Sequence, residues 1–345
     1  MSQTNYLQWL SSSTKTAWWH DSGDPAELES AIRNGAVGVT TNPVLCARAL
    51  DANRAYWRED IRRALDSHQS PTEKAEALMR IVVTHAAKQV EPSFRRTSGK
   101  HGYACAQVDP SAAGNREAML AQAKRYHAWA PNIAIKLPAT LAGLDVMEQC
   151  CSEGMTVTVT VSFTVAQVWS IAQRYQKVLE RNRKSGRETG RCFAVIMIGR
   201  LDDYLREVFA DNRAPVSEEE LRMAGLSVVK HAYRLYQESS LEAVLLVAAM
   251  RGNYHMTELS GGDLILSIHP SYQKSLFDAS VDRTEKIDEP IPEAALESLS
   301  RQPEFRKAYD PSAMSEKELI AFGLTQRTLS QFVETGWRPL EQFRP

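Results

Sequence analysis

The sequence of 345 residues carries 41 lysines and arginines against 42 acidic residues, which leaves a net charge of -1. This balance gives no overall positive field, so we expect no nucleic-acid partner. The hydrophobic content of 43% allows a large core, whereas no apolar run approaches membrane-spanning length. The opening segment, MSQTNYLQWLSSSTKT, is too polar for a signal peptide, and we expect a cytoplasmic protein without membrane contact.

Short apolar runs of the kind that form buried strands recur along the chain. They are AWWH (17–20), AVGVT (36–40), YACAQV (103–108), IAIKL (133–137), VTVTVSF (157–163), FAVIMI (193–198), AVLLVAAM (243–250) and DLILSI (263–268). Long segments with helix signals separate them.

The helix signals are those of N-caps and first turns. Asp24 followed by Pro25 predicts the start of a helix that Gly35 ends. Further helices are predicted over 71–90, 115–130 and 217–237, the last of which opens with the capping-box pattern SEEE.

Alternating strands and helices of this kind predict an α/β fold, a (β/α)8 TIM barrel. We expect one domain over residues 1–345, with the barrel over about 17–280. The mostly helical stretch 44–100 indicates an insertion after the second strand. A C-terminal helical extension over about 288–345 is expected to end in an amphipathic helix, 315–333, that docks on the barrel.

The cysteines and histidines give no sign of a metal site. The cysteines are odd in number and lack metal-ligand spacing, which indicates reduced thiols that serve as small core residues; they are Cys46, Cys105, Cys150, Cys151 and Cys192. The eight histidines form no HExxH or other paired pattern. We therefore predict no metal and no cofactor.

The residue that most directly suggests chemistry is Lys136, inside the apolar run NIAIKLPAT. Active sites of such barrels lie where the strands end. Burying an unpaired ammonium is costly, and apolar surroundings favour the neutral amine that can attack a ketone and form a Schiff base. Asp21 is the leading candidate for the acid/base, with Thr160 or Gln107 placing a water molecule.

Structural explanations stay open for several of these residues. Lys136 could reach solvent past Pro138, and Asp21 could cap the turn before the helix at Pro25. Asn42 precedes a proline, where it is most often structural. The alternating threonines of the fifth run could form only a wet inner face.

The arginines that follow the sixth and seventh runs are also ambiguous. Arg200 could form a surface ion pair of little energetic weight with Asp202 and Asp203. Arg251, taken alone, indicates nothing.

In order and placement, these pieces resemble the transaldolases, class I Schiff-base enzymes on a (β/α)8 barrel. The likeness extends from about residue 17 to about 333. It rests on WWHDSGD, GVTTNPVL, AIKLPATLAGLDVMEQCCSEGMTVTVTVSFTVAQ, IGRLDDY, AAMRGNYHMTELSGGDLILSIHP and DPSAMSEKELIAFGLTQRTLSQF.

The resemblance implies a catalytic role for each residue that matches the motifs. Lys136 would be the Schiff-base nucleophile, Asp21 the acid/base at carbon–carbon cleavage, and Thr160 the residue that fixes the catalytic water. Gln107 would also belong to this catalytic group.

The same resemblance implies the substrate contacts. Asn42, with Thr40 beside it, would hold a donor-sugar hydroxyl, and Arg200 with Arg251 would clamp a terminal phosphate. The implied partners are sugars or sugar phosphates in the pentose phosphate pathway, and a homodimer is possible.

The chain departs from the family at several positions. Gln107 stands where the family usually has a glutamate, and it can orient a water but cannot accept its proton. Glutamine there resembles the related fructose-6-phosphate aldolases, yet their sixth-strand tyrosine is Met197 here. Two serines that assist the arginines appear as Val195 and Ala249, and a fifth-strand asparagine appears as Thr158. The substrate shell has therefore changed.

Three functions remain open on this basis. The first is transfer of a dihydroxyacetone unit from a ketose to an aldose, which the missing tyrosine favours. The second is an aldolase that releases the three-carbon unit, which Gln107 favours. The third is a barrel that binds a sugar phosphate without turnover, although such a module needs no buried amine. We favour transfer.

Overall fold

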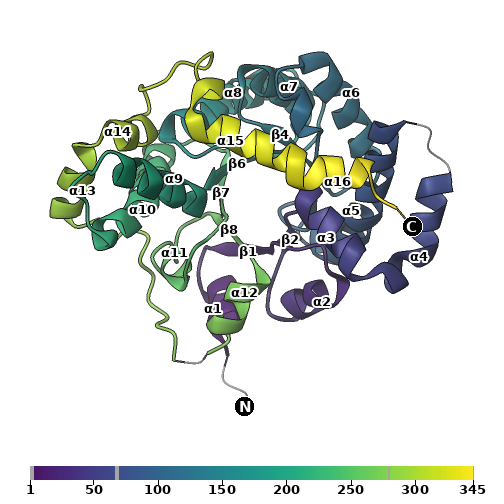
Figure 1. The fold of residues 1–345 in the computed structure, drawn as a ribbon, viewed down its shortest axis with the longest axis horizontal. Coiled ribbons are helices and arrows are strands. Elements are labelled where there is room, and N and C mark those ends of the chain that lie inside the picture. The colour runs from purple at the N-terminus through teal and green to yellow at the C-terminus, as the bar shows by residue number, and fades with distance from the viewer. Residues whose placement is uncertain (1–3, 67–69, 279, 345) are drawn as a thin grey trace.

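The protein is described by a computed structural model over residues 4–66, 70–278 and 280–344. In it, parallel strands pair in chain order and the last pairs with the first, which closes a barrel (Figure 1). The strands are β1 (Ala17–His20), β2 (Gly38–Val39), β3 (Tyr103–Gln107), β4 (Ile133–Pro138), β5 (Val157–Thr160), β6 (Cys192–Met197), β7 (Val244–Ala248) and β8 (Ile265–Ile268). The predicted (β/α)8 TIM barrel is confirmed.

Helices precede, connect and follow the strands and cover the barrel wall. They are α1 (Tyr6–Ser13), α2 (Pro25–Arg33), α3 (Pro43–Ala52), α4 (Arg54–Asp66), α5 (Pro71–Arg96), α6 (Arg116–His127), α7 (Leu141–Ser152), α8 (Val165–Lys184), α9 (Ile198–Asp211), α10 (Glu218–Glu238), α11 (Asn253–Thr257), α12 (Pro270–Leu276), α13 (Glu293–Ser300), α14 (Pro303–Tyr309), α15 (Gly323–Phe332) and α16 (Arg338–Glu341). The predicted helical stretch between β2 and β3 is confirmed as α3, α4 and α5.

The predicted helix starts rest on the capping bonds that the sequence indicated. Asp24 accepts hydrogen bonds from the backbone N–H groups of Ala26 and Glu27 and so caps α2. Ser217 forms the expected capping box at the start of α10. Helix α5 runs beyond its predicted end at residue 90 to Arg96, and its buried side chains end at Val90. Its last turns therefore lack the apolar pattern from which a helix is predicted.

The C-terminal helix begins later than predicted. Glu318 accepts hydrogen bonds from the N–H and hydroxyl of Ser315, as in a capping box, but only a 3-10 turn follows at Leu319–Ala321. Phe322 is extended, so α15 starts at Gly323. Figure 1 shows α15 and α16, in yellow, crossing the view over the barrel strands, and α15 packs against α9.

Aromatic side chains fill the barrel interior toward the N-terminal ends of the strands. The ring of Phe193 contacts those of Trp19 and Tyr103 edge-on, with centroids 4.8 and 5.5 Å apart. A Cβ on Gly38 would lie 2.5 Å from the Trp19 indole, so the short strand β2 has room for this ring only because it begins with glycine. The interior is a packed core and not a pore.

All five cysteines are buried and free, as predicted for core thiols. None of the helices in the described ranges combines the length and apolar character that a bilayer crossing needs.

The contact between Gly38 and Trp19 can be tested by Gly38→Ala. Because the added methyl group would overlap the indole, we expect the free energy of unfolding in urea to fall by about 1–3 kcal/mol. Gly114→Ala is the matched control, since a Cβ there meets nothing within 4 Å. Equal stability of the two variants would contradict the packing described.

Candidate active site

Lys136 lies in the barrel wall near the C-terminal end of β4 and is 7% exposed. Its ammonium donates a hydrogen bond of 3.2 Å to the carbonyl of Thr41 and forms no ion pair within the described residues. The alternative in which the side chain reaches solvent past Pro138 is therefore wrong.

The neighbours of Lys136 across the sheet are polar. In strand register it lies between Gln107 of β3 and Thr158 of β5. Gln107 is 3% exposed, and its side-chain oxygen is buried without a hydrogen-bond partner among the described residues. A buried acceptor left unpaired is destabilising, so this oxygen is suited to a donor that arrives with a substrate or water.

Asp21 follows β1 and is held by a short chain of hydroxyl groups. Its carboxylate accepts a hydrogen bond of 2.7 Å from Thr40, whose hydroxyl also lies 2.5 Å from that of Ser267 on β8. Asp24, not Asp21, caps α2, so the capping alternative for Asp21 is wrong. Sequence reasoning missed Ser267, for which the only signal is a polar residue in the apolar run DLILSI.

Asn42 and Thr160 each form one side-chain polar contact within the described residues. The Asn42 side-chain oxygen caps α3 by accepting a bond of 3.0 Å from the Leu45 N–H, which is the structural role left open above. Thr160 is 1% exposed, and its hydroxyl lies 4.0 Å from the Met197 sulfur. The next residue, Val161, has a φ of +57°, a strained conformation for a β-branched side chain. Such strain is often found at functional sites.

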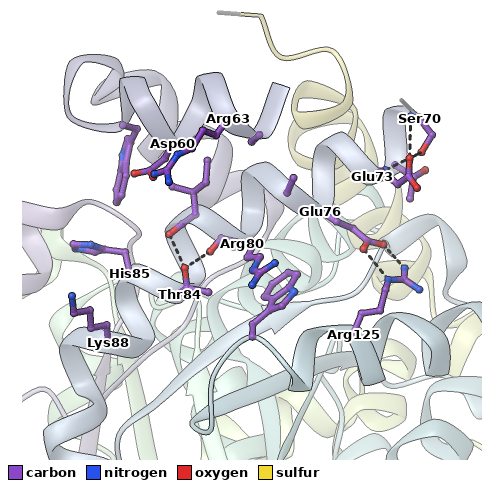
Figure 2. A pocket seen from close by; sticks show the side chains of 16 residues that line it. Asp60, Arg63, Ser70, Glu73, Glu76, Arg80, Thr84, His85, Lys88 and Arg125 are labelled. Atoms are coloured by element: carbon purple, nitrogen blue, oxygen red, sulfur yellow. Dashed lines mark hydrogen bonds and ion pairs between the residues drawn. The ribbon is translucent and has the colours of Figure 1, made fainter. Parts of the chain in front are cut away.

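Two pockets differ in their relation to these residues. One of about 1010 Å³ lies outside the barrel between α4, α5 and α6, where Glu76 pairs with Arg125 (Figure 2). It is lined by none of the predicted site residues. A pocket of about 600 Å³ is lined by both Arg200 and Arg251, and α15 contributes Arg327 and Gln331 to it. The C-terminal helix thus forms part of the pocket that holds the two predicted arginines.

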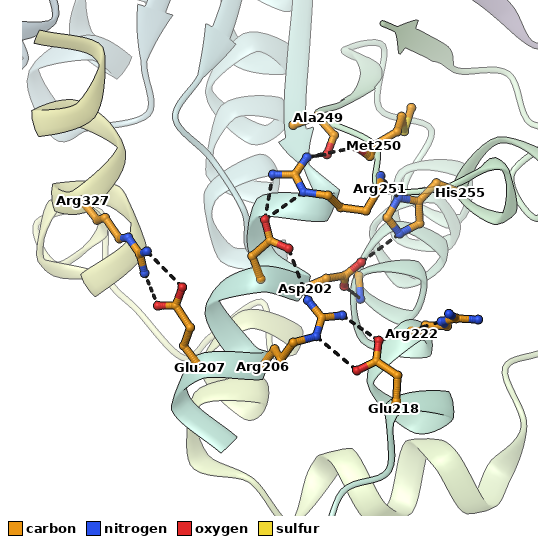
Figure 3. Close-up of polar contacts among 12 residues, drawn as sticks. Asp202, Arg206, Glu207, Glu218, Arg222, Ala249, Met250, Arg251, His255 and Arg327 are labelled. Atoms are coloured by element: carbon orange, nitrogen blue, oxygen red, sulfur yellow. Dashed lines mark hydrogen bonds and ion pairs between the residues drawn. The ribbon is translucent and has the colours of Figure 1, made fainter. Parts of the chain in front are cut away.

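The two arginines of this mouth are positioned differently. The Arg251 guanidinium bonds Asp203 and the Ala249 carbonyl, each at 2.8 Å (Figure 3). Arg200 donates to Gln331 and lies over the Phe332 ring, 5.3 Å from its centroid. Burial, and then repulsion from Arg251, lowers the pKa of Arg200 to about 10. Both arginines line the same pocket, where one anion could contact the two guanidinium groups.

The alternative in which Arg200 forms an ion pair with Asp202 and Asp203 is wrong, because both carboxylates have other partners. Asp203 binds Arg251 and Arg206. Asp202 is buried and lies 2.8 Å from His255 (Figure 3).

His255 holds the backbone of Arg251 in position. Its Nδ1 accepts a bond of 3.1 Å from the Arg251 N–H, while its Nε2 faces Asp202. The other Asp202 oxygen accepts the Gly225 N–H at 2.9 Å. Sequence analysis missed the pair of Asp202 and His255, for which the only signal is that a histidine lies four residues after Arg251.

The arrangement brings an amine, a carboxylate and an unpaired amide to the strand ends of one barrel. A pocket with two adjacent guanidinium groups opens at the same end. Such a set is suited to a carbonyl substrate that carries an anionic group. The described residues hold no group of three or more His, Cys, Asp or Glu side chains placed to bind a metal ion.

Comparisons with known proteins give the family to which the chain is similar. The family model described as Transaldolase/Fructose-6-phosphate aldolase matches residues 18–332. A protein named Transaldolase from Thiobacillus denitrificans is 26% identical, over 87% of this chain and 85% of its own. The Transaldolase of Neisseria gonorrhoeae is 24% identical, over 92% and 90%. The Transaldolase of Thermobifida fusca is 30% identical, over 67% of this chain and 65% of its own.

The family model covers most of the chain, including every strand after the first residue of β1. The predicted resemblance to transaldolases, and with it the expectation of an enzyme of this type, is confirmed. The chain belongs to the transaldolase/fructose-6-phosphate aldolase family.

Proposed function

We propose that this protein transfers a dihydroxyacetone unit from a ketose phosphate to an aldose phosphate through a Schiff base on Lys136. The observation that carries the proposal is the burial of Lys136 without a carboxylate partner among the described residues. The Lys136 nitrogen is therefore not held in an ion pair, and an amine that attacks a ketone forms a Schiff base.

The proposed reaction begins when the Lys136 nitrogen attacks the donor ketone, and loss of water then gives a protonated imine, which can accept an electron pair. Asp21 removes the proton of the hydroxyl beside the carbon–carbon bond that breaks, and this cleavage releases an aldehyde. The electron pair of that bond stays on the lysine adduct as an enamine. Attack of this enamine on an acceptor aldehyde forms the new bond, the alkoxide regains its proton from Asp21, and water hydrolyses the imine.

The hydroxyl chain around Asp21 supports its role as the acid/base. The Thr40 hydroxyl donates to the Asp21 carboxylate, which fixes the position of this group without neutralising it. Thr160 and Gln107 are proposed to hold the water that enters and leaves during imine chemistry. Only one of the two Asp21 carboxylate oxygens accepts the bond from Thr40, which leaves the other for the proposed proton transfer.

Arg200 and Arg251 are proposed to bind the terminal phosphate of the donor. Two adjacent guanidinium groups match the oxygens of a phosphate monoester. Asp203 pairs with Arg251, so an incoming phosphate would share this arginine with Asp203 or displace it. Asn42 is proposed to bind a donor hydroxyl through its amide nitrogen, because its oxygen caps α3.

Several narrower expectations come from the sequence pattern or from the family resemblance. A single domain, action in the pentose phosphate pathway, a cytoplasmic location and a homodimer stay predictions. An aldolase that releases the three-carbon unit is the second candidate function, which the amide of Gln107 favours. A barrel that binds sugar phosphates without turnover is the third.

The choice among these functions can be made with fructose 6-phosphate, assayed with and without erythrose 4-phosphate. We expect a new ketose phosphate when both are present, and little free dihydroxyacetone when the acceptor is left out. Lys136→Met, which removes the amine but keeps the apolar stem, should reduce turnover to the uncatalysed background. The matched control, Lys88→Met, changes a lysine outside the barrel and should keep full activity.

Two results would contradict transfer. Release of dihydroxyacetone at the same rate with and without acceptor would favour the aldolase. Absence of turnover with a panel of ketose phosphates, together with measurable binding, would favour the non-catalytic barrel.

Gln107→Glu tests the lost carboxylate. If proton transfer at the water limits imine formation, the new base should speed pre-steady-state imine formation by about tenfold or more, since general base catalysis contributes on the order of a hundredfold. Gln107→Met is the matched control, because it removes the acceptor and should slow the step. Weaker donor binding by the glutamate variant would instead assign Gln107 to substrate recognition, and no change in either variant would remove it from the site.

A further inference from the structure

A second polar pocket lies at the opposite mouth of the barrel. It measures about 390 Å³ and is lined by the first residues of β1, β7 and β8 and by segments just before β2, β3 and β6. All of these are N-terminal strand ends, whereas Lys136 lies near the C-terminal end of β4. The buried rings of Trp19, Tyr103 and Phe193 fill the interior on this side. The pocket is therefore distinct from the candidate active site.

The charges that line this pocket are mostly positive. Lys15, Lys100 and Arg191 face a single carboxylate, that of Asp263. Across the described ranges, none of these three cations forms an ion pair. Like charges in a concave, partly enclosed site repel one another, and a bound anion relieves that repulsion.

Among these three cations, Arg191 is held in place by backbone hydrogen bonds and by a ring contact. Its backbone N–H donates to the Thr156 hydroxyl at 3.3 Å, and its carbonyl accepts the Val157 N–H at 2.8 Å. The guanidinium lies over the Phe193 ring, 5.7 Å from the centroid. The Arg191 Nε is buried without a hydrogen-bond partner in the part of the chain that the structure describes. A fixed guanidinium without an acceptor is suited to paired phosphate oxygens.

His101 adds a polar ring to the same pocket. Burial, and then the charges of Lys100 and Arg191, lower the pKa of His101 to about 4. The imidazole is therefore neutral at pH 7. Its Nδ1, like the Nε of Arg191, is buried without a partner among the residues described. Lys100 and Arg191 thus add a positive potential to the effect of burial, and a bound anion would reduce that potential.

We propose that this pocket binds the phosphate group of a small phosphorylated molecule, with Arg191 as the main contact and Lys15 and Lys100 as additional cations. The volume falls within the range of about 300–1,000 Å³ typical of small-molecule sites. This site goes beyond the proposed transfer reaction and does not depend on it, because it shares no residue with the catalytic mouth.

The test measures binding of inorganic phosphate and pyrophosphate by calorimetry, in a background that lacks the other arginine pair. In an Arg200→Gln/Arg251→Gln protein we expect phosphate binding to persist. Adding Arg191→Gln should weaken it by about tenfold or more, the loss expected for a charge-assisted contact. Arg187→Gln is the matched control, because it changes an exposed arginine close in sequence but not in the pocket.

Two outcomes would overturn the proposal. One is loss of all phosphate binding in the Arg200→Gln/Arg251→Gln protein. The other is equal affinity after Arg191→Gln and Arg187→Gln, which would mean an adventitious ion only. If Arg191→Gln does not fold, as judged by circular dichroism, Lys100→Gln on the exposed rim replaces it, with the same expected direction. Binding is the readout throughout, so the result is separate from success or failure of the transfer reaction.

Discussion

The buried amine of Lys136, held by the carbonyl of Thr41, is the interaction on which the candidate active site depends. Strand β3 lies between β4, which carries the lysine, and β2, which Thr41 follows, so the lysine side chain reaches past one strand of the barrel. Burial alone does not mark a nucleophile, however. Lys230 on α10 is similarly buried at 6% exposure, but it donates to two carbonyls, those of Lys286 and Glu289. It lies outside the barrel interior and ties a loop to a helix.

The two ends of the barrel differ in chemistry because a packed core separates them. Aromatic rings close the interior near the N-terminal ends, where Gly38 leaves space for Trp19. At the C-terminal ends, polar side chains replace these rings, and α15 adds a wall that reaches Arg200. The pocket that we propose for the donor phosphate is thus formed by the C-terminal helix as well as by residues that follow the strands. His255, which pairs with the buried Asp202, in turn holds the backbone of Arg251, and Arg251 lines this pocket.

Much of the fold could be predicted because its signals are local. Apolar runs matched the strands, and the caps at Asp24 and Ser217 matched helix starts. The start of α15 was missed because Ser315 and Glu318 form a cap-like pair that leads only into a 3-10 turn. A local pattern of side chains does not reveal that the backbone becomes extended at Phe322.

The candidate site could be predicted less completely, because its contacts join distant parts of the chain. The strand pattern predicted that Lys136 and Gln107 lie toward the C-terminal ends of their strands, and they do. The bond from Thr40 to Ser267 and the pairing of Asp202 with His255 have no local sequence pattern, and both were missed. The apolar neighbours of Lys136 in sequence also concealed its polar neighbours across the sheet, Gln107 and Thr158.

The most direct measurement of the central claim is borohydride reduction in the presence of fructose 6-phosphate, followed by intact mass and peptide mapping. We predict one covalent adduct, with the mass of the reduced donor-derived imine, on the peptide that contains Lys136. Lys230, equally buried but bonded to two carbonyls, should stay unmodified and serves as an internal control. An adduct on Lys230 or another lysine, or labelling that persists in Lys136→Met, would contradict the Schiff-base role of Lys136.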